Sequence, residues 1–521
     1  MGSSQSREPP KKQRVLVVGA GAAGTACAWS LSRFPERFEV EVWEALPVPG
    51  GVASSCKVKD GRHVINDQVQ GGAPSYRHNL SLLQLFGFKP TPVHMRIAFG
   101  VGEKQWTNHS PSELTTRLQP EIERFGRLIR WISRLEPLFV FIPIDRVLKW
   151  FRFSHEFRYE MILPLVALFF GTGNQTPHVS AAVIARVFLD PDLRLFDYCP
   201  QRLLNSVPEM FAFPVLEDIW TTIARQSNFK LCCNRPLAKL VRTPGGGAVA
   251  MDAAGTSAAF DSVVFACDAE TVLKTLSNPT WLERRLLGNV RYYTDYCLTH
   301  EDHDYMARKY DVRPAQRDNY FVRTYAGRDA DKIEMSFNLS TYQPHLKEAG
   351  LDIYQTYYLD AKQKHLWSDK EVDPSKVLAS RWMRQFAHTW THFACWVPWG
   401  RFIQGTHNTY YAGSYTMVNT QEIAVMSGLA AAVRLGADYP FPHDPLAAKQ
   451  MDTYLAVAHG ASRPKQLQQQ QQQAQAQRGG AGAGGSSTGG SGGSSSSSAA
   501  GVKGVVPLVA GAVSSSSGKP A

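Results

Sequence analysis

A glycine-rich segment near the beginning of the chain has the residue types and spacing needed to hold a phosphate. The residues that we expect to contact a dinucleotide here are Gly19, Gly21, Ala22, Ala23 and Gly24. They form a G-x-G-x-x-G motif, in which glycine allows a tight turn and a close approach of the backbone to a pyrophosphate. The apolar run 14–18 before the motif predicts a buried strand, and residues 25–32 after it predict a helix whose free N–H groups favour an anion.

An acidic residue follows at the spacing that this chemistry requires. A second predicted strand, 38–43, ends at Glu44, which lies about 20 residues beyond the last glycine of the motif. A carboxylate in this position hydrogen-bonds the hydroxyls of the adenosine ribose. Because the same carboxylate would repel a 2′-phosphate, the sequence disfavours NADP.

Further segments along the chain extend this pattern. They are Pro49-Gly50-Gly51, the predicted strands 229–233, 237–241 and 261–268, the run 409–414, and Glu422 with 427–431. With these collinear segments the chain resembles the FAD-dependent amine-oxidase/phytoene-desaturase superfamily. The resemblance implies FAD as the cofactor and an oxidoreductase activity.

The resemblance also implies roles for individual residues. Gly50 and Gly51 would pass close to the FAD pyrophosphate, and Leu237 would pack near the adenine. Gly413 would make a tight turn before a last helix over about 420–435, which carries Glu422 and faces the flavin. One departure from the superfamily pattern lies in the same region, because Val48 occupies the place of a phosphate-binding arginine.

Smaller matches resemble one branch of the superfamily, whose members occur beside or fused to cyclopropane-fatty-acyl synthases. These are Thr299-His300-Glu301-Asp302 with Met306, Ser336-Phe337-Asn338 with Gln343, and Gln404-Gly405. By association, the branch implies a redox reaction on a lipid. Two departures weigh against amine oxidation: Thr420 stands where amine oxidases have an aromatic residue, and 287–300 lacks their lysine. An amine oxidase and a non-catalytic, flavin-bound interaction protein remain the alternatives.

The segments 76–155 and 157–211 are rich in aromatic and aliphatic residues at helical spacing. Such helices form either a plain core or the lining of a hydrophobic substrate pocket. The candidate pocket residues are Trp106, His300, Trp396, Trp399, Tyr410 and Tyr411, and each can equally be a packed core residue. His300 is the one candidate acid–base group among them, although a lone histidine is more often structural. The catalytic residues are otherwise unknown.

We therefore predict an α/β fold in which a Rossmann-type FAD-binding domain is interleaved with an α+β substrate domain, flanked by disordered tails. The FAD-binding segments are 14–75, 225–290 and 400–440, and the substrate segments are 76–224 and 291–399. The tails are a lipidated basic leader, 1–13, and a Gln/Gly/Ser-rich stretch, 461–521, which lacks the apolar residues needed to fold.

The leader carries a signal for attachment to a membrane. Met1-Gly2-Ser3-Ser4-Gln5-Ser6 matches the pattern for myristoylation of Gly2, and basic residues follow it. We expect a cytoplasmic protein that contacts the membrane peripherally, without a transmembrane helix, because the longest uncharged apolar run, 161–172, is too short. The body of the chain shows no dense Lys/Arg stripe with interleaved aromatic residues, so we do not expect nucleic-acid binding. The sequence also lacks the residue spacing of a metal site.

Overall fold

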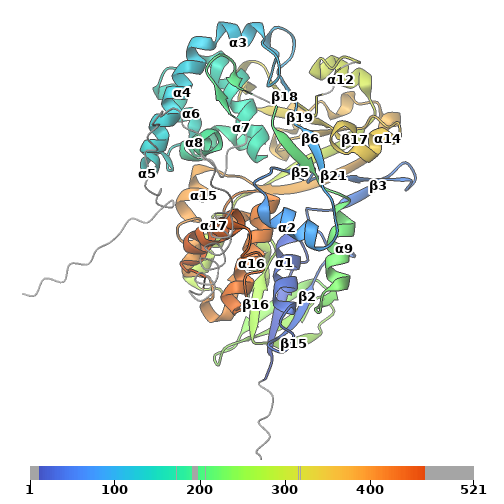
Figure 1. Cartoon of the computed structure of the whole chain (residues 1–521), viewed down its shortest axis with the longest axis vertical. Helices are drawn as coiled ribbons and strands as arrows, with labels where there is room; N and C mark the ends of the chain where they lie inside the picture. The colour runs from blue at the N-terminus through green and yellow to red at the C-terminus, as the bar shows by residue number, and fades with distance from the viewer. Residues whose placement is uncertain are drawn as a thin grey trace, which may run out of the picture.

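The structure is a computed structural model that describes residues 11–171, 173–189, 197–205, 207–314, 316 and 318–463. It has two lobes, which Figure 1 shows one above the other. The lower lobe contains a parallel sheet, and the upper lobe contains a mixed sheet with a group of helices beside it. Gly2, most of the basic leader and all of the C-terminal stretch beyond residue 463 lie outside the described residues.

A five-stranded parallel sheet forms the centre of the lower lobe. Its strands, in spatial order, are β12 (Lys230–Cys232), β2 (Phe38–Trp43), β1 (Gln13–Val18), β16 (Ser262–Phe265) and β22 (Thr409–Tyr411). The central strand β1 reads as an apolar run because both of its faces are covered. Val15 and Val17 pack toward one layer, and Leu16 and Val18 toward the other.

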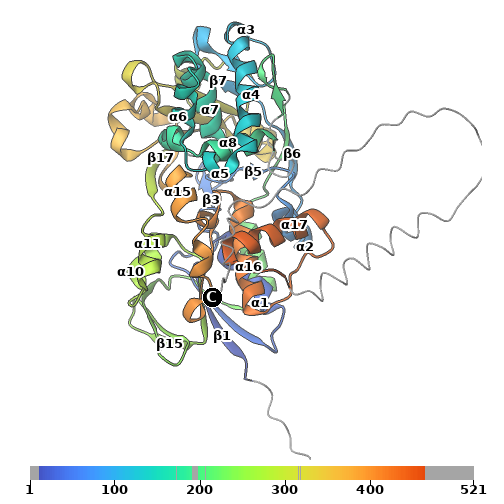
Figure 2. The ribbon, with the colours of Figure 1, turned by 90° about the vertical axis from the view of Figure 1, so that its left-hand side faces the viewer.

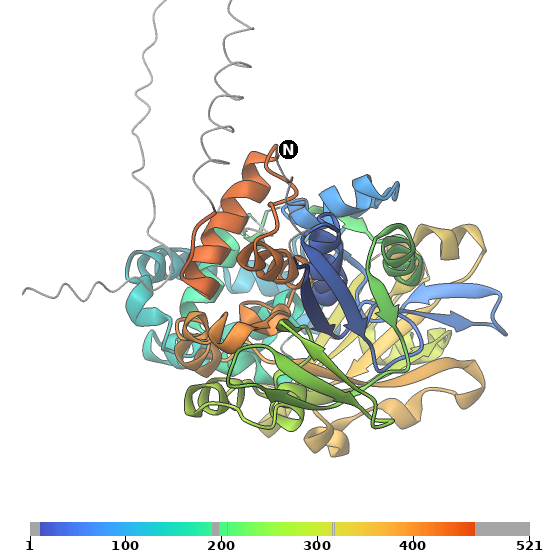
Figure 3. The same ribbon diagram turned by 90° about the horizontal axis from the view of Figure 1, so that it is seen from below.

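Helices cover the first face of this sheet. The helix α1 (Ala22–Ser32) follows β1 directly, and α16 (Gln421–Leu435) lies against it although almost 400 residues separate them. The surrounding helices are α2 (Arg77–Leu85), α9 (Leu216–Gln226) and α17 (Pro445–Tyr454). Figure 3, seen from below, shows α1 in blue next to the orange C-terminal helices.

The second face carries a three-stranded antiparallel sheet. It consists of β13 (Leu237–Arg242), β14 (Ala248–Asp252) and β15 (Ser257–Phe260), and the helices α10 (Ala269–Thr275) and α11 (Trp281–Leu287) follow in the chain. Trp43 at the end of β2 contacts Phe260 edge to face, with ring centroids 6.0 Å apart. The parallel sheet is thus sandwiched between a helical layer and a β layer.

The upper lobe is built on a seven-stranded, mostly antiparallel sheet. Its strands, in spatial order, are β21 (Val377–Phe386), β17 (Tyr292–His300), β20 (Tyr354–Tyr358), β19 (Ile333–Asn338), β18 (Tyr320–Thr324), β7 (Ile97–Phe99) and β8 (Trp106–Thr107). The main helices beside it are α3 (Glu113–Arg117), α4 (Gln119–Arg134), α5 (Glu136–Phe139), α6 (Ile144–Trp150), α7 (Leu163–Phe170) and α8 (Ala181–Leu189). In Figure 2 these helices face the viewer in the upper lobe.

The chain passes between the lobes several times. The parallel sheet takes its strands from 13–43, 230–265 and 409–411, and the large mixed sheet takes its strands from 97–107 and 292–386. The predicted α/β fold, with a Rossmann-type domain interleaved with an α+β domain, is confirmed. Within the described ranges, no helix has both the length and the apolarity to cross a bilayer.

Candidate functional site

The glycine motif forms a tight turn at the carboxyl end of β1. Gly19 has a positive φ of 99°, and its N–H donates to the carbonyl of Trp43 at 2.8 Å. Gly24 lies so close to the turn that a Cβ there would sit 1.9 Å from the carbonyl oxygen of Gly19. Gly21 is different, since a Cβ there would meet only the Gly50 oxygen at 3.8 Å, which leaves its outer side open. The motif therefore combines tight packing at Gly24 with accessible backbone at Gly21.

Glu44 connects the end of β2 to this turn. One carboxylate oxygen accepts the N–H of Ala20 at 2.6 Å, and the other accepts the N–H of Leu46 at 2.8 Å. The side chain is buried. Each carboxylate oxygen can accept a second hydrogen bond, so Glu44 can hold the turn and still accept ribose hydroxyls.

A second glycine pair lies beside the first. Gly50 donates its N–H to the carbonyl of Ala20 at 2.8 Å and forms an isolated parallel bridge with Gly21. Gly50 and Gly51 have φ values of 129° and 59°, which side chains rarely adopt, and a Cβ on Gly51 would lie 3.3 Å from the Gly21 Cα. Together the two segments form a strip of backbone without side chains at the amino end of α1.

The helix α1 begins at this strip without a side-chain cap. Its N-cap is Gly21, and neither an acidic residue in the first turn nor a side-chain hydrogen bond satisfies the first N–H groups. Ala22 and Ala23 in this first turn are buried. Uncapped N–H groups and the helix dipole together favour a bound anion, so the strip fits the pyrophosphate of a dinucleotide.

The last predicted segment lies against the first. Gly413, after β22, has a φ of 135°, and its N–H donates to the Ser427 hydroxyl at 2.8 Å. The helix α16 spans Gln421–Leu435, close to the predicted 420–435, with Thr420 as its N-cap and Gly436 as its C-cap. A Cβ on Gly428 would lie 2.0 Å from the carbonyl of Ala23, so α16 packs closely on α1.

Two buried polar atoms near the start of α16 lack a partner among the described residues. They are the hydroxyl of Tyr415 and the side-chain nitrogen of Gln421. Such orphaned groups are rare in a finished core and are expected where a ligand completes the site. Together with the glycine strip and Glu44, they fit a dinucleotide whose far end extends toward α16. On the other face of the parallel sheet, Leu237 is buried at the start of β13.

Glu422, which the resemblance assigns to the cofactor, makes its hydrogen bonds elsewhere. Its carboxylate accepts the backbone N–H groups of His78 and Asn79 at 2.7 and 3.0 Å. It also contacts Nδ1 of His78 at 2.6 Å and accepts the Asn79 side-chain amide at 2.7 Å. Glu422 therefore caps the amino end of α2 and fixes that helix to α16.

The candidate pocket residues do not come together in one wall. Trp106 stacks on Phe99 at the far edge of the large sheet, with ring centroids 4.1 Å apart. Trp399 is 50% exposed, and its indole N–H donates to a nearby carbonyl. Tyr411 donates to Glu283 at 2.6 Å on the β-layer side, and Tyr410 lies at the edge strand of the parallel sheet. The Trp396 ring lies 5.2 Å from the Tyr415 ring, measured between centroids.

His300 occupies a structural position in the large sheet. It is fully buried, its Nε2 bonds the Thr356 hydroxyl at 3.0 Å, and its Nδ1 accepts the N–H of Asp302 at 3.2 Å. Burial lowers the pKa of His300 to about 4. Ser336, another residue of the branch motifs, bonds the same Thr356 hydroxyl at 3.0 Å. These motif residues therefore brace the interior of the sheet, and His300 does not face a pocket.

A small cavity at the end of β21 contains polar groups that no sequence motif indicated. Its volume is about 10 Å³, which is room for roughly one water molecule, and its lining includes Tyr293, Asp295, Asp360, Gln385 and Phe386. Asp295 accepts the N–H of Asp360 at 2.6 Å and the Gln385 amide at 2.5 Å. Burial raises the pKa of Asp295 to about 6.

Two histidines connect this cavity to the start of α16. His388 and His392 lie 4.9 and 5.2 Å from the Phe386 ring, measured between centroids. His388 Nε2 accepts the N–H of Asn419 at 2.5 Å, one residue before the α16 N-cap. The polar cavity and the dinucleotide site are therefore neighbours across Phe386.

Comparisons with known proteins agree with this geometry. Residues 17–97 match a family described as an NAD(P)-binding Rossmann-like domain. No curated protein matches the chain by sequence.

Three solved structures are similar in fold. A cyclohexylamine oxidase from Brevibacterium oxydans is 12% identical, with 82% of this chain and 100% of that chain covered and a TM-score of 0.58. A putative protoporphyrinogen oxidase from Exiguobacterium is 14% identical, with 82% and 99% covered and a TM-score of 0.58. A fatty acid isomerase from P. acnes that produces CLA is 14% identical, with 81% and 99% covered and a TM-score of 0.56.

The similarity to these structures spans both lobes, whereas the family match falls on the first Rossmann segment and its continuation. Sequence identities of 12 to 14% establish a common fold and nothing finer. The chain therefore shares its overall fold with these three structures, and its residues 17–97 match the NAD(P)-binding Rossmann-like family.

Proposed function

We propose that the protein is an FAD-dependent oxidoreductase that removes a hydride from a hydrophobic, lipid-like substrate. The observation that carries the proposal is the strip of side-chain-free backbone beside Glu44, together with buried aromatic residues that share an apolar cluster with the helices of the upper lobe. Gly21, Gly50 and the amino end of α1 would hold the pyrophosphate, and Glu44 the ribose. When bound, FAD supplies the electron acceptor that the side chains of this chain lack.

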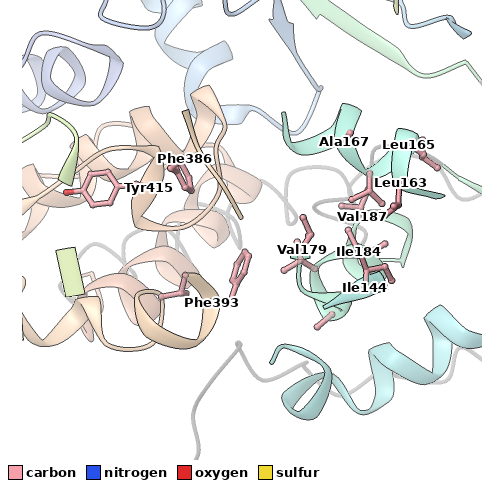
Figure 4. Packing of buried hydrophobic residues seen from close by; sticks show 14 of the residues in the cluster. Ile144, Leu163, Leu165, Ala167, Val179, Ile184, Val187, Phe386, Phe393 and Tyr415 are labelled. Atoms are coloured by element: carbon pink, nitrogen blue, oxygen red, sulfur yellow. The ribbon is translucent and has the colours of Figure 1, made fainter. Parts of the chain in front are cut away.

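The buried aromatic residues support a hydrophobic substrate. Phe386, Phe393, Trp396 and Tyr415 are buried in the same apolar cluster as the helices of the upper lobe. Figure 4 shows Phe386 and Phe393 on the side of the cluster nearest the C-terminal segments, with Val179 of the helical lobe across from Phe393. An apolar environment at the reacting carbon excludes water and suits an acyl chain.

An anaerobic titration of the full chain tests the proposal. The purified protein, with its flavin spectrum confirmed, is mixed with long-chain unsaturated fatty acids or total phospholipid, and separately with putrescine and spermidine. Bleaching of the flavin by the lipids is the expected result. Bleaching by amines alone would overturn the lipid assignment. A flavin that dithionite reduces but no substrate does would favour a non-catalytic, flavin-bound interaction protein.

Amine oxidation is the second candidate, because the cavity near β21 favours it. Asp295 and Asp360 both line this cavity, and none of its lining residues is a lysine, arginine or histidine. A buried carboxylate without a cation would attract an ammonium group. If amines are substrates, Asp295→Asn is expected to raise the KM for putrescine at least tenfold with little change in kcat. A lipid substrate should show no such change, and an unaltered KM for amines would exclude this role for Asp295.

We also propose that the leader is myristoylated at Gly2. The support is the sequence pattern and the basic residues after it. Mass spectrometry of the amino-terminal peptide from the native source is expected to show one myristoyl group, and an unmodified glycine would contradict the proposal.

A further inference from the structure

The outer surface of the helical lobe carries an unusual concentration of exposed apolar side chains. Six large apolar residues between 131 and 151 are 36 to 62% exposed, namely Trp131, Leu135, Leu138, Phe141, Trp150 and Phe151. We refer to the surface that they form with the basic residues around them as the aromatic-basic face. Contiguous apolar exposure of this kind marks an interaction site.

The charges on this face all have one sign. The exposed ionisable residues between 127 and 152 are Arg127, Arg130, Arg134, Arg146, Lys149 and Arg152. The two acids of the segment, Glu136 and Asp145, are mostly buried and already paired, Glu136 with Arg186 and Asp145 with Arg158 and Lys149. The face therefore presents cations and apolar groups together, with no exposed carboxylate among residues 127–152. The expectation that the chain lacks a basic stripe with interleaved aromatic residues is corrected by this face.

Contacts between the helices hold these residues on one side of the lobe. Trp131 of α4 contacts Phe151, just after α6, with ring centroids 5.6 Å apart, and it contacts Phe139 of α5 at 4.9 Å. Arg124 donates to the carbonyl of Phe151 and joins the same two helices. Figure 1 places α4, α5 and α6 at the outer left edge of the upper lobe, away from the parallel sheet.

We propose that the aromatic-basic face docks on the surface of a membrane that contains anionic lipid. Indole rings prefer the interface between headgroups and acyl chains, and arginine stems extend along apolar surface while their charges reach the phosphates. Basic and apolar residues on one face are the combination that binds an anionic bilayer without crossing it. A second copy of the chain fits poorly, because a symmetric contact would place six cations against six cations.

Vesicle co-flotation of the full, unacylated chain tests the proposal. We expect the protein to float with vesicles of 70% phosphatidylcholine and 30% phosphatidylserine, and to stay behind with pure phosphatidylcholine. High salt should weaken the binding, since exposed charges are screened. Brominated lipids should quench the tryptophan fluorescence of the unaltered protein. Absence of flotation and of quenching with the anionic vesicles would refute the proposal.

Matched variants distinguish membrane binding through this face from binding through the overall positive charge of the chain. Trp150→Ser with Leu138→Ser, and separately Arg130→Glu with Arg134→Glu, are expected to reduce the partition coefficient at least tenfold. The controls Trp281→Ser and Arg285→Glu change residues of the same types on α11, in the other lobe, and should remain within twofold of the parent. Retained binding in both test variants would refute the assignment. Self-association through this face, seen by analytical ultracentrifugation and lost in the variants, would replace the membrane with a second copy.

Discussion

Replacement of Gly24 by alanine is expected to abolish tight flavin binding and to destabilise the protein. The added Cβ would lie 1.9 Å from the carbonyl oxygen of Gly19, whereas ordinary contact begins at 3.4 Å. Because the obstructing atom is backbone, the turn must move by more than 1 Å, about the difference between these distances. It would also lie 3.2 Å from the Cβ of Ala266, which limits movement on the other side.

The magnitude follows from the cost of overpacking, which is typically 1–3 kcal/mol. We expect about 3 kcal/mol here, because neither neighbour is a flexible side chain. If that cost falls on the cofactor-binding conformation, the affinity for FAD drops by about 100-fold, at 1.4 kcal/mol for each factor of ten. This loss of FAD affinity is separate from any decrease in the free energy of unfolding of the flavin-free protein, and both effects would destabilise the protein with bound FAD.

Titration of the flavin-free protein with FAD, and urea unfolding with and without FAD, measure the two effects. The matched control is Gly245→Ala, in the turn between β13 and β14, where a Cβ would meet nothing within 4 Å and φ is not positive. Its stability and affinity should stay near those of the parent protein. If Gly24→Ala bound FAD within threefold of the parent and unfolded at the same urea concentration, the rigid contact between α1 and the turn would be disproved.

Two further predictions concern Glu422 and His300, whose side chains make buried hydrogen bonds in the structure. Glu422→Gln should lower the free energy of unfolding, measured with urea, by about 2–4 kcal/mol, because four donors from His78 and Asn79 lose their charged acceptor. Its affinity for FAD should change less than threefold. Unchanged urea unfolding together with a large loss of FAD affinity would show instead that Glu422 binds the cofactor. For His300, the folded pKa of about 4 lies below the unfolded value of 6.5, so the unfolded chain binds the proton first as the pH falls. Stability is therefore intact above pH 6.5 and is lost between pH 6.5 and 4, by about 3 kcal/mol for this residue. Urea unfolding at several pH values should show a shallower loss in His300→Asn, and an identical pH dependence would contradict the assignment.

The elements around the dinucleotide were predictable from the sequence because their signals are local. The apolar run of β1, the glycine turn and Glu44 lie within about 30 residues of one another, and each has a direct backbone reason for its type. The bounds of β2 and α16 follow from local signals of the same kind. The apolar run of β2 stops before Glu44, and Gly436 is the C-cap that ends α16.

The rest depended on partners that are distant in sequence. Glu422 accepts hydrogen bonds from residues almost 350 positions earlier, so a motif on its own helix could not reveal that role. His300 has the chemistry of an acid–base group, and only the folded chain shows that Nε2 meets Thr356 of β20 while Nδ1 accepts the N–H of Asp302. Asp295 belongs to no motif, and its position in a cavity arises from pairing between β17 and β21.

The interleaving of the chain has a consequence for its biosynthesis. The two strands β1 and β2 leave the ribosome early, but the partner on the free side of β1 is β16, and the sheet is completed by β22 about 390 residues after β1. At translation rates of about 5–20 residues per second, roughly 20–80 seconds separate these events. During that interval the growing sheet presents an unpaired, strongly apolar edge, first that of β1 and then that of β16, the kind of edge that pairs with other chains. The nascent protein must therefore be shielded until β22 is made, and a shortened chain that ends before β22 should aggregate rather than fold.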